Sequence, residues 1–254
     1  MCRLAAYVGP PRSLHSLWLA PEHSLERQSF APREMKTALL NADGFGMAWY
    51  TPGEETPARY RTILPLWADE NVRSMAKHLV SGYALANVRS ATIGMPIQLS
   101  NVSPFVEGRW TFTHNGFVRD FHPVIARRIR DSLDDARYGA IVGNTDSEHL
   151  GAFVMSRLDG VDGDPTEAVV GALEAIVGLV DGRKTLLNVI VGDGRWLVAV
   201  RHAMNGEAPS LYHRIRGDAV EVVSEPLDDD GWTEVAPGSV LTVDPGRNTA
   251  WRTL

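Results

Sequence analysis

The order of strand-type and helix-type segments is the feature that most limits how this chain can fold. Segments with the β-branched or aromatic content of strands dominate the first 113 residues, helical periodicity dominates the middle, and strands return from Thr185 onward. No Gly-, Ser- or Pro-rich linker separates these parts. The order therefore predicts one layered α+β domain over residues 1–254, with at least one sheet packed against helices.

The individual elements follow from local pattern. We expect strands over 3–8, 44–50, 59–64, 83–88, 110–113, 186–191, 196–200, 211–215, 220–223 and 240–243. We expect helices over 13–19, 69–80, 124–129, 147–158 and 166–180. Gly9-Pro10-Pro11 should end the first strand, 44–50 and 59–64 should pair as a hairpin, and 20–43 and 90–108 should be loops.

Charge and cysteine content exclude several classes of protein. The 254 residues carry 25 Lys and Arg against 31 Asp and Glu, a net charge of −6, which argues against binding to nucleic acid or an anionic membrane. The single cysteine, Cys2, cannot form an internal disulfide. No apolar run approaches the roughly 20 residues of a membrane-spanning helix, and the N-terminus lacks a signal-peptide pattern. We expect a cytoplasmic protein.

Cys2 is a candidate nucleophile because it follows the initiator Met1, which is removed when the second residue is small. A free α-amine has a pKa of roughly 7.7–8.0, so it can serve as the base for a thiol on the same residue. A small buried hydrophobic residue explains a lone cysteine equally well.

Three further positions carry chemistry. His114-Asn115-Gly116 is predicted to lie in a turn after a strand, where an amide side chain and an N–H can form an oxyanion hole, although Asn-Gly is also an ordinary turn dipeptide. Arg89 ends a buried strand and suits bidentate binding of a carboxylate, with an internal ion pair as the alternative. Asp146 opens a helix, where it could simply be the N-terminal cap.

We expect no metal and no cofactor. The eight histidines show no paired ligand spacing, and Asp228-Asp229-Asp230-Gly231 lacks the spaced ligands of a calcium loop, so a solvated turn is favoured there.

Taken together in chain order, these motifs resemble the class II glutamine amidotransferases, a branch of the N-terminal nucleophile hydrolases. The matching segments, all within the first 150 residues or so, are Met1-Cys2-Arg3, Asn41-Ala42-Asp43-Gly44-Phe45-Gly46, Val88-Arg89-Ser90-Ala91-Thr92, His114-Asn115-Gly116 and Thr145-Asp146-Ser147-Glu148.

The resemblance implies a fold and a set of roles. The fold would be a four-layer αββα sandwich, and the reaction would be attack of Cys2 on a γ-glutamyl amide, giving a glutamyl-thioester that water cleaves to glutamate. It implies that Asn115 and Gly116 stabilise the oxyanion. Arg89 would bind the α-carboxylate of the glutamyl group, Asp146 its α-ammonium, and Thr92 the same end.

Within the family, segments 41–46, 89–96 and 108–110 are similar to the amidohydrolases of ergothioneine biosynthesis, which act on γ-glutamyl-hercynylcysteine sulfoxide. Two departures stand out: many relatives have histidine where this chain has Asn87 and Ser103. We expect these changes to leave the glutamyl contacts alone and to affect the leaving-group side.

The trimethylammonium group of such a substrate favours aromatic or acidic surroundings. Phe45, Trp49, Phe105, Trp110 and Asp43 are candidates for that environment, with the core as the more frequent location for such side chains.

Other functions stay open on this sequence. They are hydrolysis of other γ-glutamyl dipeptides, as in glutathione breakdown with a partner subunit, a glutaminase subunit that supplies ammonia to a partner, and a non-catalytic binding protein. The expected ligand is a small γ-glutamyl molecule, and a homo-oligomer also stays open.

Overall fold

The structure, a computed structural model, describes residues 1–35, 39–92 and 94–254. Residues 36–38 of the predicted loop at 20–43, and Ile93 of the motif at 89–96, lie outside the described residues. In the described part of the chain, none of the helices combines the length and apolar character that crossing a membrane requires.

Two antiparallel sheets form the centre of the molecule. The seven-stranded sheet has the order β11 (Thr233–Glu234), β9 (Tyr212–Arg216), β10 (Ala219–Val223), β1 (Arg3–Ser13), β4 (Val80–Val88), β2 (Phe45–Trp49), β3 (Ala58–Thr62). The six-stranded sheet has the order β13 (Thr249–Thr253), β12 (Ser239–Val243), β8 (Leu197–Met204), β7 (Thr185–Gly192), β6 (Trp110–Val118), β5 (Phe105–Glu107).

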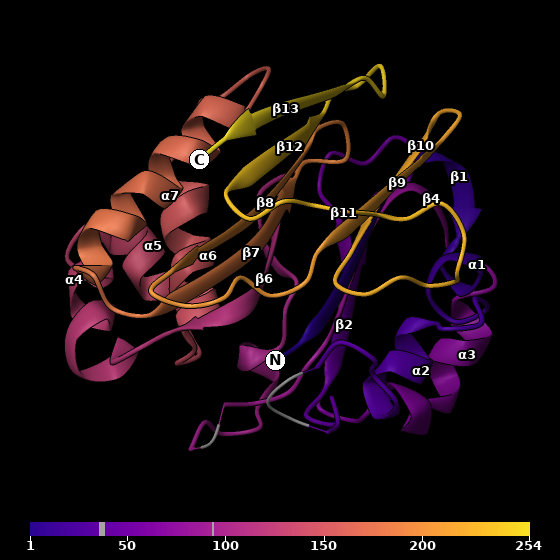
Figure 1. The fold of residues 1–254 in the computed structure, drawn as a ribbon, viewed down its shortest axis with the longest axis horizontal. Coiled ribbons are helices and arrows are strands. Elements are labelled where there is room, and N and C mark those ends of the chain that lie inside the picture. Colours follow the sequence, from indigo (N-terminus) through magenta and orange to yellow (C-terminus); the bar gives the residue numbers. More distant parts are fainter. Residues whose placement is uncertain (36–38, 93) are drawn as a thin grey trace.

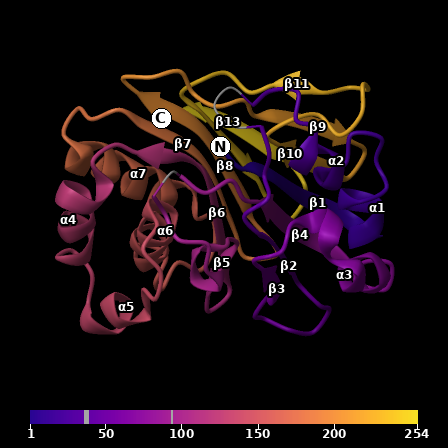
Figure 2. The ribbon, with the colours of Figure 1, turned by 90° about the horizontal axis from the view of Figure 1, so that it is seen from below.

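Helices cover the outer face of each sheet, as Figures 1 and 2 show. The seven-stranded sheet carries α1 (Leu14–Trp18), α2 (Leu25–Phe30) and α3 (Glu70–Met75). The six-stranded sheet carries α4 (Ala126–Arg130), α5 (Asp135–Ala140), α6 (Asp146–Ser156) and α7 (Thr166–Val180). The four layers confirm the predicted αββα sandwich of an α+β fold.

Alternation along each strand builds this arrangement, because successive side chains of a strand point to opposite faces. In β1, Leu4, Ala6 and Val8 join the apolar core between the two sheets. Ala5 and Tyr7 join a second core, against α1 and α2. A third core lies between the six-stranded sheet and its helices. Both faces of β1 are therefore apolar over residues 4–8.

Side-chain caps start the helices where the sequence offers an oxygen. Ser13 caps α1 by accepting from Ser16 N, as the predicted start of that helix requires. Thr145 caps α6 by accepting from the N–H of Glu148 at 3.2 Å. Asp146 is therefore the first residue of the helix rather than its cap.

Several local predictions are wrong at their ends. β1 continues past Gly9-Pro10-Pro11 to Ser13, because a register irregularity between Val8 and Arg12 absorbs the prolines and pairing with β4 resumes. The helix predicted over 69–80 is the shorter α3, and β4 begins at Val80. The strands at 44–50 and 59–64 do pair as the predicted hairpin.

The predicted turn at His114-Asn115-Gly116 is also wrong, because β6 runs through it to Val118 and pairs with β7. A Cβ at Gly116 would lie 1.8 Å from Leu186 O. The fold needs glycine here because the backbone of β7 packs closely against β6, and not because glycine favours turns.

Candidate active site

Cys2 lies immediately before β1, at the end of a central strand that pairs with both β4 and β10. Its Sγ is 3.9 Å from Ser90 O, and its own carbonyl accepts a hydrogen bond from Arg3 Nε at 2.8 Å. The side chain is half-buried. A rigid strand on one side and the loop after β4 on the other therefore fix the thiol at a partly open position.

Two hollows meet at Cys2. We call the first, of about 40 Å³, the inner pocket; its lining is Cys2, Asn87, Arg89, Ser90, Ala91, Thr92, Met95, Asn101, Ser103, His114, Gly116, Thr145, Asp146 and Ser147. We call the second, of about 680 Å³, the outer cleft; its lining is Met1, Cys2, Glu34, Ser90, Ala91, Thr92, Gly116, Phe117, Lys184, Leu186, Arg201, Glu207, Ala208, Pro209, Ser210, Tyr212 and Glu234. The thiol would therefore lie between a small group bound in the inner pocket and a bulkier group bound in the outer cleft.

Arg89 supplies a cation to the inner pocket. It is buried, and its guanidinium donates only two long hydrogen bonds, of 3.4 Å each, to Asp43 O and Pro96 O. Among the described residues no carboxylate pairs with it, so the alternative of an internal ion pair is not seen. A buried guanidinium with two weak carbonyl contacts is suited to receive an anion.

Asp146 supplies an anion to the same pocket. Its Oδ2 accepts from the N–H of Val118 at 2.8 Å, and its Oδ1 accepts from the N–H of Ser147 at 2.7 Å. The first bond ties the start of α6 to the end of β6. Arg89 and Asp146 carry opposite charges and line one pocket, which Thr92 also lines. This arrangement matches the α-carboxylate and α-ammonium groups of an amino acid.

His114 lines the inner pocket as a neutral ring. Its Nε2 donates to Leu186 O at 2.8 Å, so its Nδ1 is the acceptor for the hydroxyl of Ser147 at 2.9 Å. Burial lowers the pKa of His114, against the opposing effect of Asp146 and the bond to Leu186 O. The sequence analysis used His114 only as part of a motif and missed this link to Ser147.

The two predicted oxyanion residues lie in different surroundings. Gly116 lines both the inner pocket and the outer cleft. The side chain of Asn115 is buried and lines neither; its Nδ2 donates to Ser224 Oγ at 3.4 Å, and Ser224 Oγ also accepts from Leu4 N at 3.0 Å. Asn115 is thus joined through one hydroxyl to the strand that carries Cys2, and its role in oxyanion stabilisation stays a prediction.

The expected effect of Asn87 and Ser103 on the leaving-group side stays a prediction. Both line the inner pocket and neither lines the outer cleft. Asn87 Nδ2 donates to Thr113 Oγ1 at 3.2 Å, and the same hydroxyl lies 3.0 Å from Ser103 Oγ. The two departures from the family pattern therefore meet at one threonine, on the side of Arg89 and Asp146.

The aromatic candidates for the surroundings of a trimethylammonium group lie in the core or against it, which is the location that the sequence favoured. Phe45 is in the core under α1–α3, and Phe105 and Trp110 are in the core under α4–α7. Trp49 packs against the first of these cores. Asp43 organises the loop after β4 instead, because its Oδ2 accepts from Ala91 N at 2.7 Å.

The outer cleft carries acidic groups and a tyrosine that the sequence analysis missed. The hydroxyl of Tyr212 donates a hydrogen bond to Glu34 Oε1 at 2.6 Å. Burial, and to a smaller extent this bond, raises the pKa of Tyr212. Arg201 pairs with Glu234 at 2.7 Å. Lys184 lies 5.7 Å from the centroid of the Phe117 ring. These residues come from distant segments, so no local motif could have grouped them.

Comparison with known proteins gives concordant matches. A family model for class-II glutamine amidotransferases matches residues 19–218. The chain is 39% identical over 245 residues to the γ-glutamyl-hercynylcysteine sulfoxide hydrolase of Mycolicibacterium smegmatis, with 96% of each chain covered.

Solved structures agree. The glutamine aminotransferase class-II domain protein from Silicibacter pomeroyi superposes with a TM-score of 0.73 at 30% identity, over 99% of both chains. The glutamine phosphoribosylpyrophosphate amidotransferase of B. subtilis superposes with a TM-score of 0.67 at 15% identity, over 99% of this chain and 49% of that one, which is a likeness of fold alone.

Proposed function

Because this chain belongs to the class-II glutamine amidotransferase family, we propose that it hydrolyses a γ-glutamyl amide with the thiol of Cys2 as nucleophile. The observation that carries the proposal is the position of Cys2 where the inner pocket meets the outer cleft. The proposal treats residues 1–254 as one domain of this family. It also places the enzyme in the cytoplasm, where a reducing environment protects the free thiol.

In this proposal Met1 is removed, so that the α-amine of Cys2 becomes the base. The terminal amine of Met1 has a pKa lowered mainly by burial, with Cys2 raising it and Arg3 lowering it. Burial at this position favours the neutral form of an amine, the form that a general base needs. Met1 itself lines the outer cleft, so its removal also enlarges the space beside the thiol.

Charge complementarity supports the binding of the glutamyl group in the inner pocket. The buried Arg89 faces the α-carboxylate, Asp146 faces the α-ammonium, and Thr92 contacts the same end. The narrow pocket suits an unbranched side chain that extends toward Cys2. The γ-carbonyl would then lie beside the thiol and near Gly116 and Asn115, the two residues assigned to the oxyanion.

The chemical steps follow from this placement. The α-amine takes the thiol proton and the thiolate attacks the γ-carbonyl, giving a tetrahedral oxyanion. The resulting ammonium returns the proton to the leaving nitrogen as the C–N bond breaks, which leaves a glutamyl-thioester and a free amine. The α-amine of Cys2 then deprotonates a water molecule, which attacks the thioester and releases glutamate and the thiol.

We assign the leaving group as hercynylcysteine sulfoxide, the amine that the name of the M. smegmatis relative implies, in ergothioneine biosynthesis. Its trimethylammonium group cannot donate a hydrogen bond and is bound best by carboxylates and aromatic faces. The outer cleft offers the Glu34–Tyr212 pair for this purpose. Its volume of about 680 Å³ is large enough for such an amine.

An intact-mass measurement tests the nucleophile. The purified protein is weighed before and after exposure to a γ-glutamyl diazo-ketone analogue of glutamine. We expect the mass to lack Met1, and to increase by one adduct that peptide mapping locates at Cys2. Retention of Met1, or a processed Cys2 that stays unmodified, would refute the mechanism.

A substrate panel tests the leaving group. We expect γ-glutamyl-hercynylcysteine sulfoxide to give a higher kcat/KM than glutathione or glutamine. Glu34→Gln should raise the KM for the first substrate and leave glutamine hydrolysis unchanged, because glutamine places only ammonia in the outer cleft. Glu54→Gln, at an exposed turn, is the matched control. Preference for glutamine would favour a glutaminase subunit, and preference for glutathione would favour a peptide-degrading hydrolase.

A further inference from the structure

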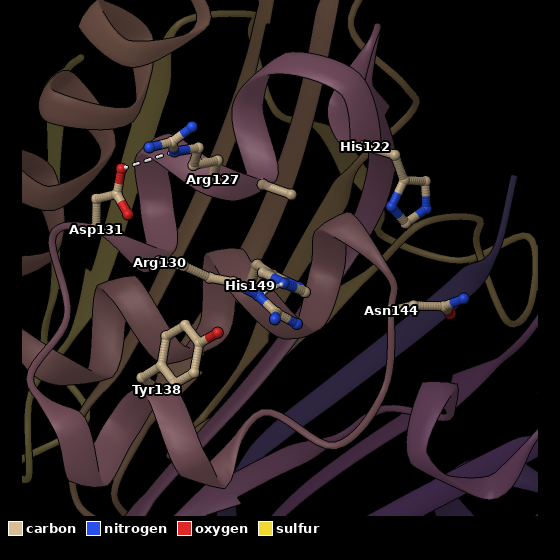
Figure 3. A pocket seen from close by; sticks show the side chains of 8 residues that line it. His122, Arg127, Arg130, Asp131, Tyr138, Asn144 and His149 are labelled. Carbon is tan, nitrogen blue, oxygen red and sulfur yellow. Dashed lines mark hydrogen bonds and ion pairs between the residues drawn. The ribbon is translucent and has the colours of Figure 1, made fainter.

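A separate cavity of about 460 Å³ lies between α4 and α6, outside the inner pocket and the outer cleft. Figure 3 shows its side chains. The residues that line it are His122, Ala126, Arg127, Arg130, Asp131, Tyr138, Asn144 and His149. This lining has two guanidinium groups and one carboxylate, so the cavity has a positive balance.

Arg130 is the central group of this cavity. It is half-buried, its Nε donates to His149 Nε2 at 2.8 Å, and its guanidinium carbon lies 5.3 Å from the centroid of the Tyr138 ring. Among the described residues no carboxylate forms an ion pair with it. The one carboxylate of the lining, Asp131, pairs instead with the exposed Arg127 at 3.4 Å. The fork of Arg130 is therefore held in place without an anion.

His149 explains why that fork is fixed. The ring is buried, and its Nδ1 donates to Thr145 O at 2.8 Å, so Nε2 is left as the acceptor for Arg130. Burial is the main cause that lowers the pKa of His149 to about 4, which keeps the ring neutral near pH 7. A neutral acceptor orients the guanidinium but does not cancel its charge.

The opposite side of the cavity is the back wall of the inner pocket. In Figure 3, His122 and Asn144 lie across from Arg130. Asn144 exchanges two hydrogen bonds with Asn101, of 2.9 and 3.1 Å, and His122 Nε2 lies 3.4 Å from Met95 Sδ. Asn101 and Met95 both line the inner pocket. A ligand that contacts Asn144 or His122 would thus press on residues of the active site.

We propose that this cavity binds a small oxyanion, a carboxylate or phosphate group held by Arg130, and that its binding changes the affinity of the inner pocket. Because Nε of Arg130 is bonded to His149, the edge formed by its two Nη atoms is the one that can bind either kind of oxyanion in a bidentate manner. The side-chain amide of Asn144 and the ring of His122 provide further donors on the opposite wall. The contacts through Asn101 and Met95 carry the effect to the site of Arg89 and Asp146.

Calorimetric titration with inorganic phosphate and, separately, with citrate tests the binding, with sodium chloride at equal ionic strength as the reference. Every protein in this titration also carries Arg89→Gln, so that Arg89 cannot be the anion site. We expect saturable binding that weakens about tenfold or more in Arg130→Gln. Arg127→Gln, on the same helix and lining the same cavity, is the matched control and should change it far less. Whether phosphate or citrate binds more tightly identifies the group that is recognised.

A second variant keeps the test valid if Arg130→Gln does not fold. Tyr138 is half-exposed on α5, so Tyr138→Glu should fold and should give Arg130 an internal carboxylate that displaces the anion. Equal binding in the Arg89→Gln parent and in its Arg130→Gln and Tyr138→Glu derivatives would overturn the proposal, as would heat indistinguishable from sodium chloride.

The coupling has its own readout. Saturating anion should shift the KM for the γ-glutamyl substrate in the wild type and leave it unchanged in Tyr138→Glu. An unchanged wild-type KM would overturn the coupling. The binding measurement does not depend on the proposed hydrolysis, so failure of the enzyme assignment and failure of the anion site give different results.

Discussion

Replacement of Arg89 by Gln tests the central contact of the proposed reaction. In the free enzyme its guanidinium makes two hydrogen bonds of 3.4 Å to carbonyl oxygens, close to the limit of such bonds. A substrate carboxylate would form two shorter, charge-assisted bonds in their place, each contributing about 1.5–3 kcal/mol. Loss of both should cost about 3–6 kcal/mol.

This energy translates into a loss of kcat/KM of about 10²- to 10⁴-fold, since each tenfold step corresponds to about 1.36 kcal/mol. The contact lies at the far end of the glutamyl group and is made equally before and during the reaction, so most of the loss should be in KM. Steady-state kinetics on γ-glutamyl-hercynylcysteine sulfoxide measures both constants. Arg137→Gln removes another buried guanidinium, on α5, which is paired with Glu107 of β5 and with Asp159 shortly after α6, and it should leave KM unchanged.

A substrate that lacks the α-carboxylate completes the experiment as a double-mutant cycle. The wild type should lose activity on this analogue by a factor similar to that of the Arg89→Gln variant on the full substrate. The variant should lose little more on the analogue. Equal losses in wild type and variant would show that Arg89 does not contact the carboxylate, and would refute the assigned orientation of the glutamyl group.

Three further changes test the framework. Burial lowers the pKa of His149 from 6.5 to about 4, so between these pH values the unfolded chain binds a proton at this residue and the folded chain does not. The free energy of unfolding should therefore fall by up to about 3 kcal/mol as the pH falls from 6.5 to 4. Urea titrations of His149→Gln should lack this part of the decline. Gly116→Ala places a Cβ 1.8 Å from Leu186 O and should cost about 3 kcal/mol and most activity, whereas an unchanged urea midpoint would contradict the close packing of β6 and β7. Glu225→Gln leaves the buried Arg3 without its anion and should cost about 3–5 kcal/mol in thermal and urea unfolding, and a loss below about 1 kcal/mol would show that this pair is not needed.

Local pattern predicted the order of strands and helices well, because alternation is a property of neighbouring residues, whereas the four layers were implied only by the family resemblance. Leu4, Ala6 and Val8 against Ala5 and Tyr7 already indicate a strand with two apolar faces. The same pattern cannot say that β1 pairs with both β4 and β10, since those strands begin at residues 80 and 219. The sheet order depends on contacts across the whole chain.

The inner pocket was predicted better than the outer cleft, for a related reason. Arg89, Thr92 and Asp146 belong to short motifs with a recognisable order, and the structure brings them together around one hollow with Cys2. Glu34 and Tyr212 are ordinary polar residues in unrelated segments, 178 positions apart, and only the folded chain joins them. The turn predicted at Asn115-Gly116 is wrong for a different reason. The local sequence favours a turn, but β7 packs against the glycine and the strand continues.

The position of Asn87 and Ser103 bears on which hollow could set the specificity for the amine. Asn87 is on β4 and Thr113 is on β6, so their hydrogen bond joins the two sheets beside the inner pocket, and Ser103 contacts the same hydroxyl. Neither residue reaches the outer cleft, in which we propose that the amine binds. The specificity for the amine must then come from the residues of the cleft itself, and Glu34 and Tyr212 are where substitution should alter it.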